Sequence, residues 1–243
     1  MSAERGRYDS LMEVITARHT CRAFAPFEVP REHYEMILEA ARHGPSGANT
    51  QPWHFVVITE PELKARISSV FVDEQLRRAR LHMGFPTPNY KGVRTAPGVI
   101  VIVADFRWVR AFPLLHDGSD LDRAYRQNAE RILTQSVAAS TMAAHLAATA
   151  LGYGVWWITA IGQEAIQREI KPLLEVPEDL AIIDVMCFGP PQNPTYTRHK
   201  RPLAEIVSWN RYNRDSYTTD EQIDVWIKTE RSRWMYRDDA RVD

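Results

Sequence analysis

The sequence predicts a globular chain in which helices and strands are mixed around a large core. Apolar residues make up 44% of the 243 residues, which excludes a disordered chain and a small disulfide-held domain. Helical and strand patterns follow one another along the chain, with no internal repeat or low-complexity segment. Length alone allows about one and a half domains at roughly 150 residues each.

Five segments have the periodicity of helices. Apolar residues recur three and four positions apart in the first segment, which Asp9 or Ser10 can cap. Pro30 precedes the second segment and Gly44 ends it. The predicted helices are 8–18, 31–43, 60–72, 129–151 and 163–174.

Four short apolar runs predict strands, because they are rich in β-branched residues and shorter than helices. They are HFVVIT (54–59), GVIVIVAD (98–105), WWITAIG (156–162) and LAIIDVMCFG (180–189). Continuous apolar runs of this kind are typical of strands buried on both faces.

Regions 73–97 and 106–128 lack clear periodicity. Loops of this length inside a compact domain are uncommon and often act as lids. Both regions are rich in arginine, proline and aromatic residues. The arginines predict either contacts to an acidic or phosphorylated substrate or a solvated surface, and they are Arg77, Arg78, Arg80, Arg107 and Arg110.

The helix predicted at 129–151 contains eight alanines. Small residues nearly all round a helix indicate packing on more than one side, either in the core of one subunit or near a subunit interface. The segment after Ser208 is charged but carries the rings of Trp209, Tyr212, Trp226, Trp234 and Tyr236. We expect this tail to pack onto another surface.

Composition and motifs exclude several classes of function. The 30 basic and 31 acidic residues leave a net charge of −1, which gives no general field for nucleic acid. Cys21 and Cys187 are too few for a cysteine zinc site, the histidines lack zinc-hydrolase spacing, and we expect no metal. No phosphate-binding P-loop is present, and Trp157 replaces the third glycine of a dinucleotide fingerprint. Without a signal peptide or a membrane span, the expected location is the cytoplasm.

Positive charge is gathered in two short clusters, RHTCR at 18–22 and RHKR at 198–201. Arginine forks and a threonine hydroxyl are suitable partners for phosphate, although each cluster could also be a solvated basic turn. Between them in sequence lies the loop PSGANTQP at 45–52. Its amide groups could read the edge of a planar heterocycle, or it could simply connect a helix to a strand.

In this order, the motifs resemble the flavin-dependent nitroreductase family over most of the chain. The matching blocks are RHTCRAF, PSGANTQPWHFVV, APGVIVIVAD, LGYGVWWIT and HKRPLAEIV. The resemblance implies an α+β, three-layer α/β/α fold with a central, mostly antiparallel sheet wrapped by helices. It also implies one domain over 1–243, a lid at about 73–128, and a C-terminal arm at about 208–243 that embraces a partner in an intertwined homodimer. FMN would lie at the dimer interface, with NADH or NADPH as the reductant.

The resemblance also assigns residues to the flavin. Arg18, His19 and Thr20 correspond to contacts with the phosphate and the ribityl chain. Arg22 corresponds to a cation near N1 and O2 of the pyrimidine ring, where positive charge stabilises negative charge gained on reduction. Thr159 stands where the family places a donor to N5 or O4, and its hydroxyl resembles the deiodinase-like branch. Arg22 and Thr159 are therefore the expected catalytic residues.

Other assignments extend the expected flavin site. Asn89 corresponds to a ribityl or ring contact, but Gly92 replaces a common family lysine, for which Lys91 or Arg94 could substitute. The segment that the partner subunit would lay against the ring contains Pro45, Ser46, Gly47 and Asn49. The remaining phosphate cations are Arg198 and Lys200, with Arg201 as a close alternative.

The expected activity is ping-pong reduction of a nitroaromatic, quinone or similar conjugated acceptor, driven by NAD(P)H. A small aromatic substrate is expected, without nucleic acid or membrane partners. A more specialised family member remains an alternative: a reductive dehalogenase, an ene-reductase, or a dehydrogenase or oxidase of a metabolic intermediate. A non-catalytic flavin-binding or interaction protein is the alternative from another class.

Overall fold

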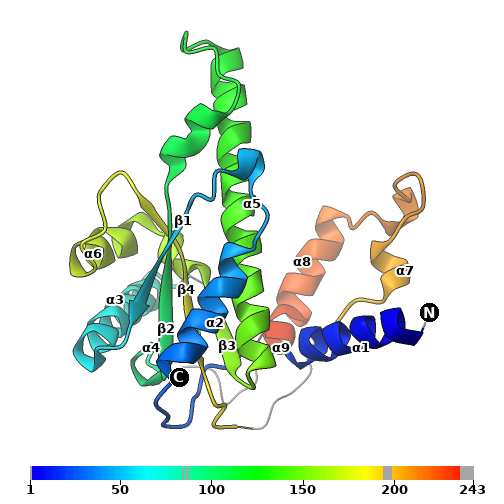
Figure 1. Cartoon of the computed structure of the whole chain (residues 1–243). Coiled ribbons are helices and arrows are strands. Elements are labelled where there is room, and N and C mark those ends of the chain that lie inside the picture. Colours follow the sequence, from blue (N-terminus) through cyan, green and yellow to red (C-terminus); the bar gives the residue numbers. More distant parts are fainter. Residues whose placement is uncertain (1, 84, 86–87, 194–198, 236–243) are drawn as a thin grey trace.

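An antiparallel sheet forms the centre of the fold (Figure 1). The computed structural model describes residues 2–83, 85, 88–193 and 199–235. The strands are β1 (Trp53–Ile58), β2 (Gly98–Ala104), β3 (Gly154–Ile158) and β4 (Ala181–Gly189). Their order is β1-β2-β4-β3, and each neighbouring pair is antiparallel. The predicted strands are confirmed, except that the third begins at Gly154 and ends at Ile158.

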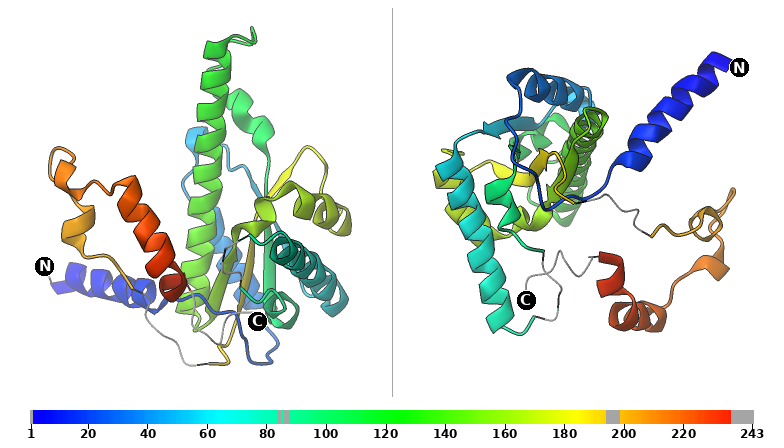
Figure 2. Two further views of the ribbon diagram at one scale, coloured as in Figure 1. Left: turned by 180° about the vertical axis from the view of Figure 1, so that it is seen from behind. Right: turned by 90° about the horizontal axis from the view of Figure 1, so that it is seen from below.

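Helices cover both faces of the sheet, as the two views in Figure 2 show. α3 (Pro61–Arg80) and α6 (Glu164–Leu173) enclose a core with one face, including Phe71 and Ile170. α2 (Arg31–Arg42) and α5 (Asp120–Ala150) enclose a second core with the other face. The α+β fold, with an antiparallel sheet wrapped by helices, is therefore confirmed.

Three predicted helix boundaries are wrong by several residues. α1 (Ser2–Ala17) begins well before Tyr8, and Ser10, proposed as a cap, instead donates its hydroxyl to the Gly6 carbonyl within the helix. α3 continues from Val72 to Arg80, and α5 begins at Asp120, with Ser119 as its N-cap. Most of the additional residues are charged or polar, so apolar periodicity gives little signal for them.

The remaining elements are short. The helices are α4 (Gly92–Thr95), α7 (Leu203–Ile206), α8 (Asp220–Thr229) and α9 (Arg231–Met235), and the 3-10 turns are η1 (Gly47–Asn49), η2 (Phe106–Ala111), η3 (Thr159–Gly162) and η4 (Arg214–Ser216). The regions expected to be structureless, 73–97 and 106–128, therefore contain the end of α3, α4, η2 and the start of α5. Among the described residues, no helix is both long and apolar enough to span a membrane.

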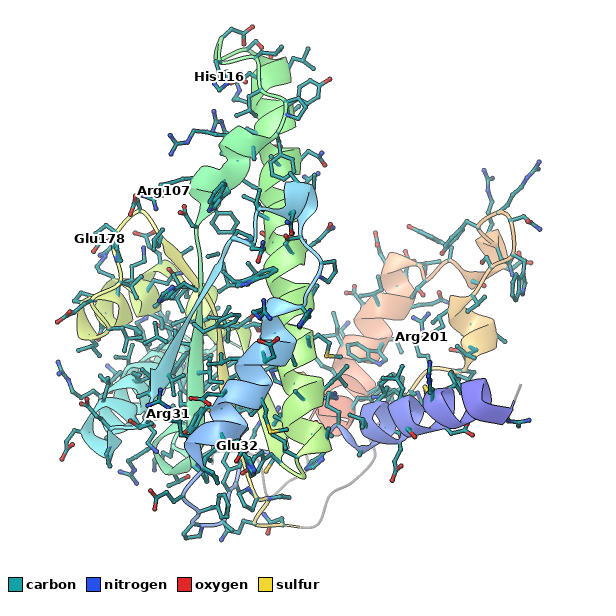
Figure 3. All side chains as sticks on the ribbon, in the orientation of Figure 1. Arg31, Glu32, Arg107, His116, Glu178 and Arg201 are labelled. Carbon is teal, nitrogen blue, oxygen red and sulfur yellow. The ribbon has the colours of Figure 1, made fainter. Side chains whose placement is uncertain are left out.

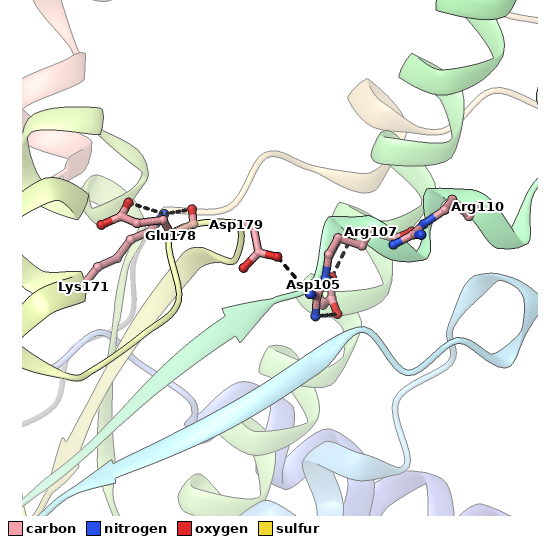
Figure 4. A network of polar contacts seen from close by, with 6 residues as sticks. All are labelled: Asp105, Arg107, Arg110, Lys171, Glu178 and Asp179. Atoms are coloured by element: carbon pink, nitrogen blue, oxygen red, sulfur yellow. Dashed lines mark hydrogen bonds and ion pairs between the residues drawn. The ribbon is translucent and has the colours of Figure 1, made fainter. Parts of the chain in front are cut away.

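Ion pairs occupy most of the arginines that were considered for an acidic substrate. Arg107 binds Asp105 and also Asp179, with Nη1 donating to Asp179 at 2.9 Å, so that η2 is tied to the loop before β4 (Figure 4). Arg77 and Arg78 both bind Glu74. These contacts favour a structural role for the three arginines.

Candidate functional site

The first cationic cluster lies along the outer edge of β3. Thr20 forms an isolated parallel bridge with Val155, and the Cys21 amide donates to the Val155 carbonyl at 2.8 Å. β3 is an edge strand, so its outer backbone groups are free to take this segment. The Arg18–Arg22 segment is thus held by backbone hydrogen bonds, while its charged side chains remain at least partly exposed.

Gly154 allows this close approach. A Cβ atom at this position would lie 2.6 Å from the Cys21 Cβ and 3.3 Å from the His19 Nε2. Burial raises the pKa of the Cys21 thiol, which donates to the Ala23 carbonyl at 3.0 Å. Cys21 therefore packs as a small apolar residue and is not an activated thiol.

Arg22 ends a column of stacked rings. Its guanidinium carbon lies 5.6 Å from the centroid of the Trp156 ring, which suits a cation–π contact. Tyr90 stacks on Trp156 at 5.6 Å between centroids, and Phe71 of α3 stacks on Tyr90 at 5.2 Å. The column connects a cation of the site with the core beneath α3.

The Asn89–Gly92 turn lies beside Arg22. A Cβ at Gly92 would collide with the Arg22 carbonyl oxygen and would lie 3.3 Å from the Trp156 ring. The Asn89 side-chain oxygen accepts from the Lys91 amide at 3.0 Å, which fixes the turn. The structure therefore brings the predicted residues Arg22 and Asn89 into one neighbourhood, and the glycine at 92 is required where a family lysine was expected.

Several buried polar atoms near the edge of β3 have no hydrogen-bond partner. Among the described residues they include the His19 Nε2 and both ring nitrogens of His145. The other nitrogen of His19, Nδ1, donates to the Ala17 carbonyl at 3.0 Å. An unsatisfied buried group costs about 1–3 kcal/mol, so such groups are rare and frequently mark a site that binds something. This corner of the molecule fits a ligand rich in hydrogen-bonding groups.

His145 lies on the α5 side of β3. Its ring stacks on Trp157 with 5.2 Å between centroids, and the residue is 1% exposed. Burial, together with the nearby charge of Arg18, lowers the pKa of His145 to about 3. The imidazole is therefore neutral at physiological pH.

Asp184 is a buried acid on the same side of the sheet. The Thr141 hydroxyl lies 3.2 Å from its carboxyl oxygen and 2.9 Å from the Val137 carbonyl. Burial raises the pKa of Asp184, although the Trp157 and Thr141 side chains oppose the shift. A protonated Asp184 could donate to Thr141 while Thr141 donates to Val137, which satisfies all three groups without a buried charge.

The Asp184→Asn variant is expected to be more stable than the natural chain at pH 8 and nearly equal to it at pH 4.5. A raised native pKa favours the protonated form, so the stability linked to Asp184 is lost as the pH rises. Removing the ionisable group should therefore raise the free energy of unfolding at pH 8, measured by urea unfolding. Asp120→Asn, at an exposed ion pair with Arg123, is the control, and equal losses for Asp184→Asn at both pH values would contradict the prediction.

Thr159 is exposed at the other end of β3. It is the first residue of η3, just after Ile158, which pairs with Val185. At about 3.3 Å per residue, Thr159 lies roughly 13 Å along the chain from Val155, where the cationic segment binds. An elongated ligand along this edge would be needed to contact both.

The predicted loop 45–52 lies far from the cationic segment within one chain. The Gly47 amide donates to the Ser136 hydroxyl of α5 at 3.1 Å, and Ala48 and Asn49 adopt left-handed backbone angles (both φ 51°). Ser136 and His145 are about 14 Å apart along α5 at 1.5 Å per residue, and η1 packs against the middle of the helix, whereas α1 lies beside its C-terminal end (Figure 1). A single chain therefore does not unite Pro45, Ser46, Gly47 and Asn49 with Arg18–Arg22.

The second cationic cluster is only partly described. Arg198 lies outside the described residues, and Lys200 is exposed. Arg201, labelled in Figure 3, donates to the Glu205 carbonyl at 3.3 Å and helps to line a cavity of about 820 Å³ with Tyr217, Trp226 and Trp234. The tail thus packs partly on itself, whereas Trp209 is 86% exposed.

Sequence reasoning missed His145, Asp184 and the close approach at Gly154. A histidine inside an alanine-rich helix is a weak signal, because its position predicts burial but not its neighbours. In the described part of the chain, no group of three or more histidine, cysteine or acidic side chains could hold a metal ion.

Comparisons with known proteins agree with this fold. The model of the nitroreductase family matches residues 15–190. An NADH dehydrogenase from Thermus thermophilus is 27% identical over 206 residues, covering 79% of this chain and 92% of that protein. An iodotyrosine deiodinase from Nematostella vectensis is 28% identical over 204 residues, covering 78% of this chain and 71% of that protein.

Solved structures give the same result at lower identity. An FMN-dependent nitroreductase from Clostridium difficile superposes with a TM-score of 0.61 at 19% identity, covering 82% of this chain and 98% of that one. The match of the family model to residues 15–190 includes the cationic segment, all four strands and Thr159. The chain belongs to the nitroreductase family.

Proposed function

We propose that this protein is an FMN-dependent oxidoreductase that uses NADH or NADPH to reduce a nitroaromatic, quinone or similar conjugated acceptor in a ping-pong reaction. The observation that carries the proposal is the cationic segment bound to the edge of β3, where Arg22 lies over Trp156. Ring nitrogens of His19 and His145 are buried nearby without a hydrogen-bond partner among the described residues. The Thermus and Clostridium proteins support it through their names, an NADH dehydrogenase and an FMN-dependent nitroreductase.

Each residue has a chemical role in this proposal. Arg18, His19 and Thr20 bind the phosphate and ribityl chain, and the Arg22 cation stabilises negative charge on the pyrimidine edge. The Thr159 hydroxyl hydrogen-bonds the ring near its reacting nitrogen. Bound FMN supplies a two-electron carrier that accepts hydride from the nicotinamide and passes electrons to the acceptor.

The site is proposed to be completed by a second copy of the chain. Pro45, Ser46, Gly47 and Asn49 of one subunit would then contact the flavin held by the other, which accounts for their distance from Arg22 in a single chain. Asn89 supports the ring side, and Lys200 with Arg198 or Arg201 supplies further charge for the phosphate. The lid at about 73–128 and the arm at about 208–243 remain part of this proposal.

A reductive dehalogenase is the second candidate. The Nematostella relative is an iodotyrosine deiodinase. Thr159 offers a side-chain hydroxyl, the feature that resembles the deiodinase-like branch. The substrate would be a halogenated phenol. It would accept two electrons and a proton at the carbon–halogen bond and release halide.

Anaerobic titration of the purified, FMN-loaded protein tests both candidates. NADH or NADPH is expected to abolish the visible flavin absorption, and a nitroaromatic or quinone is expected to restore it. Restoration only by an iodophenol, with release of iodide, would favour the dehalogenase. Failure to bind FMN, or to be reduced by either nicotinamide, would contradict the proposal.

Arg22→Ala is expected to weaken FMN binding about tenfold and to slow reduction by NAD(P)H. A charge-assisted hydrogen bond is worth about 1.5–3 kcal/mol, and one tenfold step in affinity is about 1.4 kcal/mol. Equilibrium fluorescence titration and stopped-flow absorbance measure the two effects. Arg31→Ala is the matched control, because Arg31 (labelled in Figure 3) is an exposed α2 residue paired with Glu35. Unchanged affinity and unchanged reduction in Arg22→Ala would remove Arg22 from the site.

A further inference from the structure

His145 has no role in the assignments above, yet it lies at the same corner of the molecule. It is 1% exposed, and neither ring nitrogen has a hydrogen-bond partner among the described residues. One face of its ring lies against Trp157. Arg18 is close enough for its charge to act on the imidazole.

A structural role alone does not explain a histidine at this position. A phenylalanine or leucine would fill the space between α5 and β3 without burying two unsatisfied nitrogens. Natural chains tolerate such local costs chiefly where function requires the group. The polar atoms of His145, rather than its ring volume, therefore call for an explanation.

The protonation state of His145 selects the chemistry of its partner. A neutral imidazole presents one donor and one acceptor. An anion such as phosphate could use the donor but not the acceptor. Hydroxyl groups both donate and accept, so a polyol chain matches this set.

We infer that His145 binds the ribityl hydroxyl groups of the flavin, an inference that rests on the proposed function. Arg18, which is proposed to bind the phosphate and the ribityl chain, is close enough for its charge to act on the imidazole. His145 is then a binding residue on α5, added to the segment that runs along β3.

Equilibrium titration of the flavin-free protein with three flavins tests this inference. His145→Phe keeps a ring against Trp157 and removes both nitrogens. It is expected to weaken FMN and riboflavin at least tenfold, and equally, because both carry the ribityl chain. Lumiflavin, which lacks the ribityl hydroxyls, is expected to bind within twofold of its affinity for the natural chain.

Two further variants sharpen the test. His33→Phe is the matched control, because His33 lies on α2 and its Nδ1 is already 2.7 Å from the Tyr153 hydroxyl. It should leave all three flavin affinities unchanged. His145→Gln restores one donor and one acceptor and should recover part of the lost affinity. If circular dichroism shows that His145→Phe is unfolded, His145→Gln becomes the test variant. Its loss of affinity should be smaller, but still larger for FMN and riboflavin than for lumiflavin.

The possible results separate the inference from the proposed function. Failure of the natural chain to bind FMN would contradict both the proposed function and the inference. Normal FMN binding by the natural chain with an unchanged affinity in His145→Phe overturns the inference alone. A loss confined to FMN would assign His145 to the phosphate, and an equal loss for lumiflavin would assign it to ring packing; either result also overturns the inference.

Discussion

Lowering the pH from 7 to 5 is expected to cost the flavin-free protein about 2 kcal/mol of stability through His145 alone. The native pKa of this histidine is about 3, against about 6.5 in an unfolded chain. Between these values the unfolded chain binds the proton and the native chain does not, so stability falls as the pH falls. At about 1.4 kcal/mol per pH unit, the loss accumulates from pH 6.5 downward.

Between pH 7 and pH 5, the change in stability due to His145 can be measured apart from that of most acidic side chains, which titrate at lower pH. Carboxyl groups whose pKa is held low by arginines, such as Glu39 and Glu74, lose their contribution only below about pH 4.5. Asp184 acts in the opposite direction, so Asp184→Asn serves as the background for the comparison. Urea unfolding of this variant with and without His145→Phe measures the effect. Equal losses in both proteins between pH 7 and pH 5 would contradict the prediction.

Gly154→Ala is expected to lower FMN affinity about 100-fold while leaving the sheet intact. The new Cβ would lie 2.6 Å from the Cys21 Cβ, so the Arg18–Arg22 segment must move away from β3. Loss of two charge-assisted hydrogen bonds, at about 1.5 kcal/mol each, corresponds to roughly a factor of 100 in affinity. The backbone of β3 remains paired with β4, and overpacking at an edge should cost only about 1–3 kcal/mol of stability.

Gly162→Ala is the control for this substitution, because nothing lies within 4 Å of a Cβ at position 162. It should bind FMN with the affinity of the natural chain. Fluorescence titration measures binding, and far-ultraviolet circular dichroism confirms the fold. Normal FMN affinity in Gly154→Ala would show that the contact of the cationic segment with β3 does not position it for the flavin.

The strands and the buried parts of the helices could be predicted from the sequence because burial imposes a pattern. The run GVIVIVAD appears as β2, a central strand whose residues are all buried. The extension of α3 through DEQLRRAR could not be predicted in this way, since six of its eight residues are charged or polar and give no clear apolar period. The same reason hid the first turns of α5.

The site could be predicted as a set of residue types but not as a geometry. RHTCR was recognisable as a cationic cluster, whereas its docking on β3 depends on the absence of a side chain at Gly154. His145 was predicted to lie in a helix, but its contact with Trp157 joins residues from two elements. Periodicity identifies the face on which a residue lies and not the residue it meets there.

The column of rings from Arg22 through Trp156 and Tyr90 to Phe71 makes the site part of the structural frame. Phe71 is 1% exposed in the core beneath α3, and Arg22 lies at the surface end of the same stack. A ligand that holds Arg22 in place therefore also restrains α3, and loosening of α3 releases the cation. Binding of a ligand at Arg22 and the free energy of unfolding are therefore linked, so a bound ligand is expected to stabilise the native state.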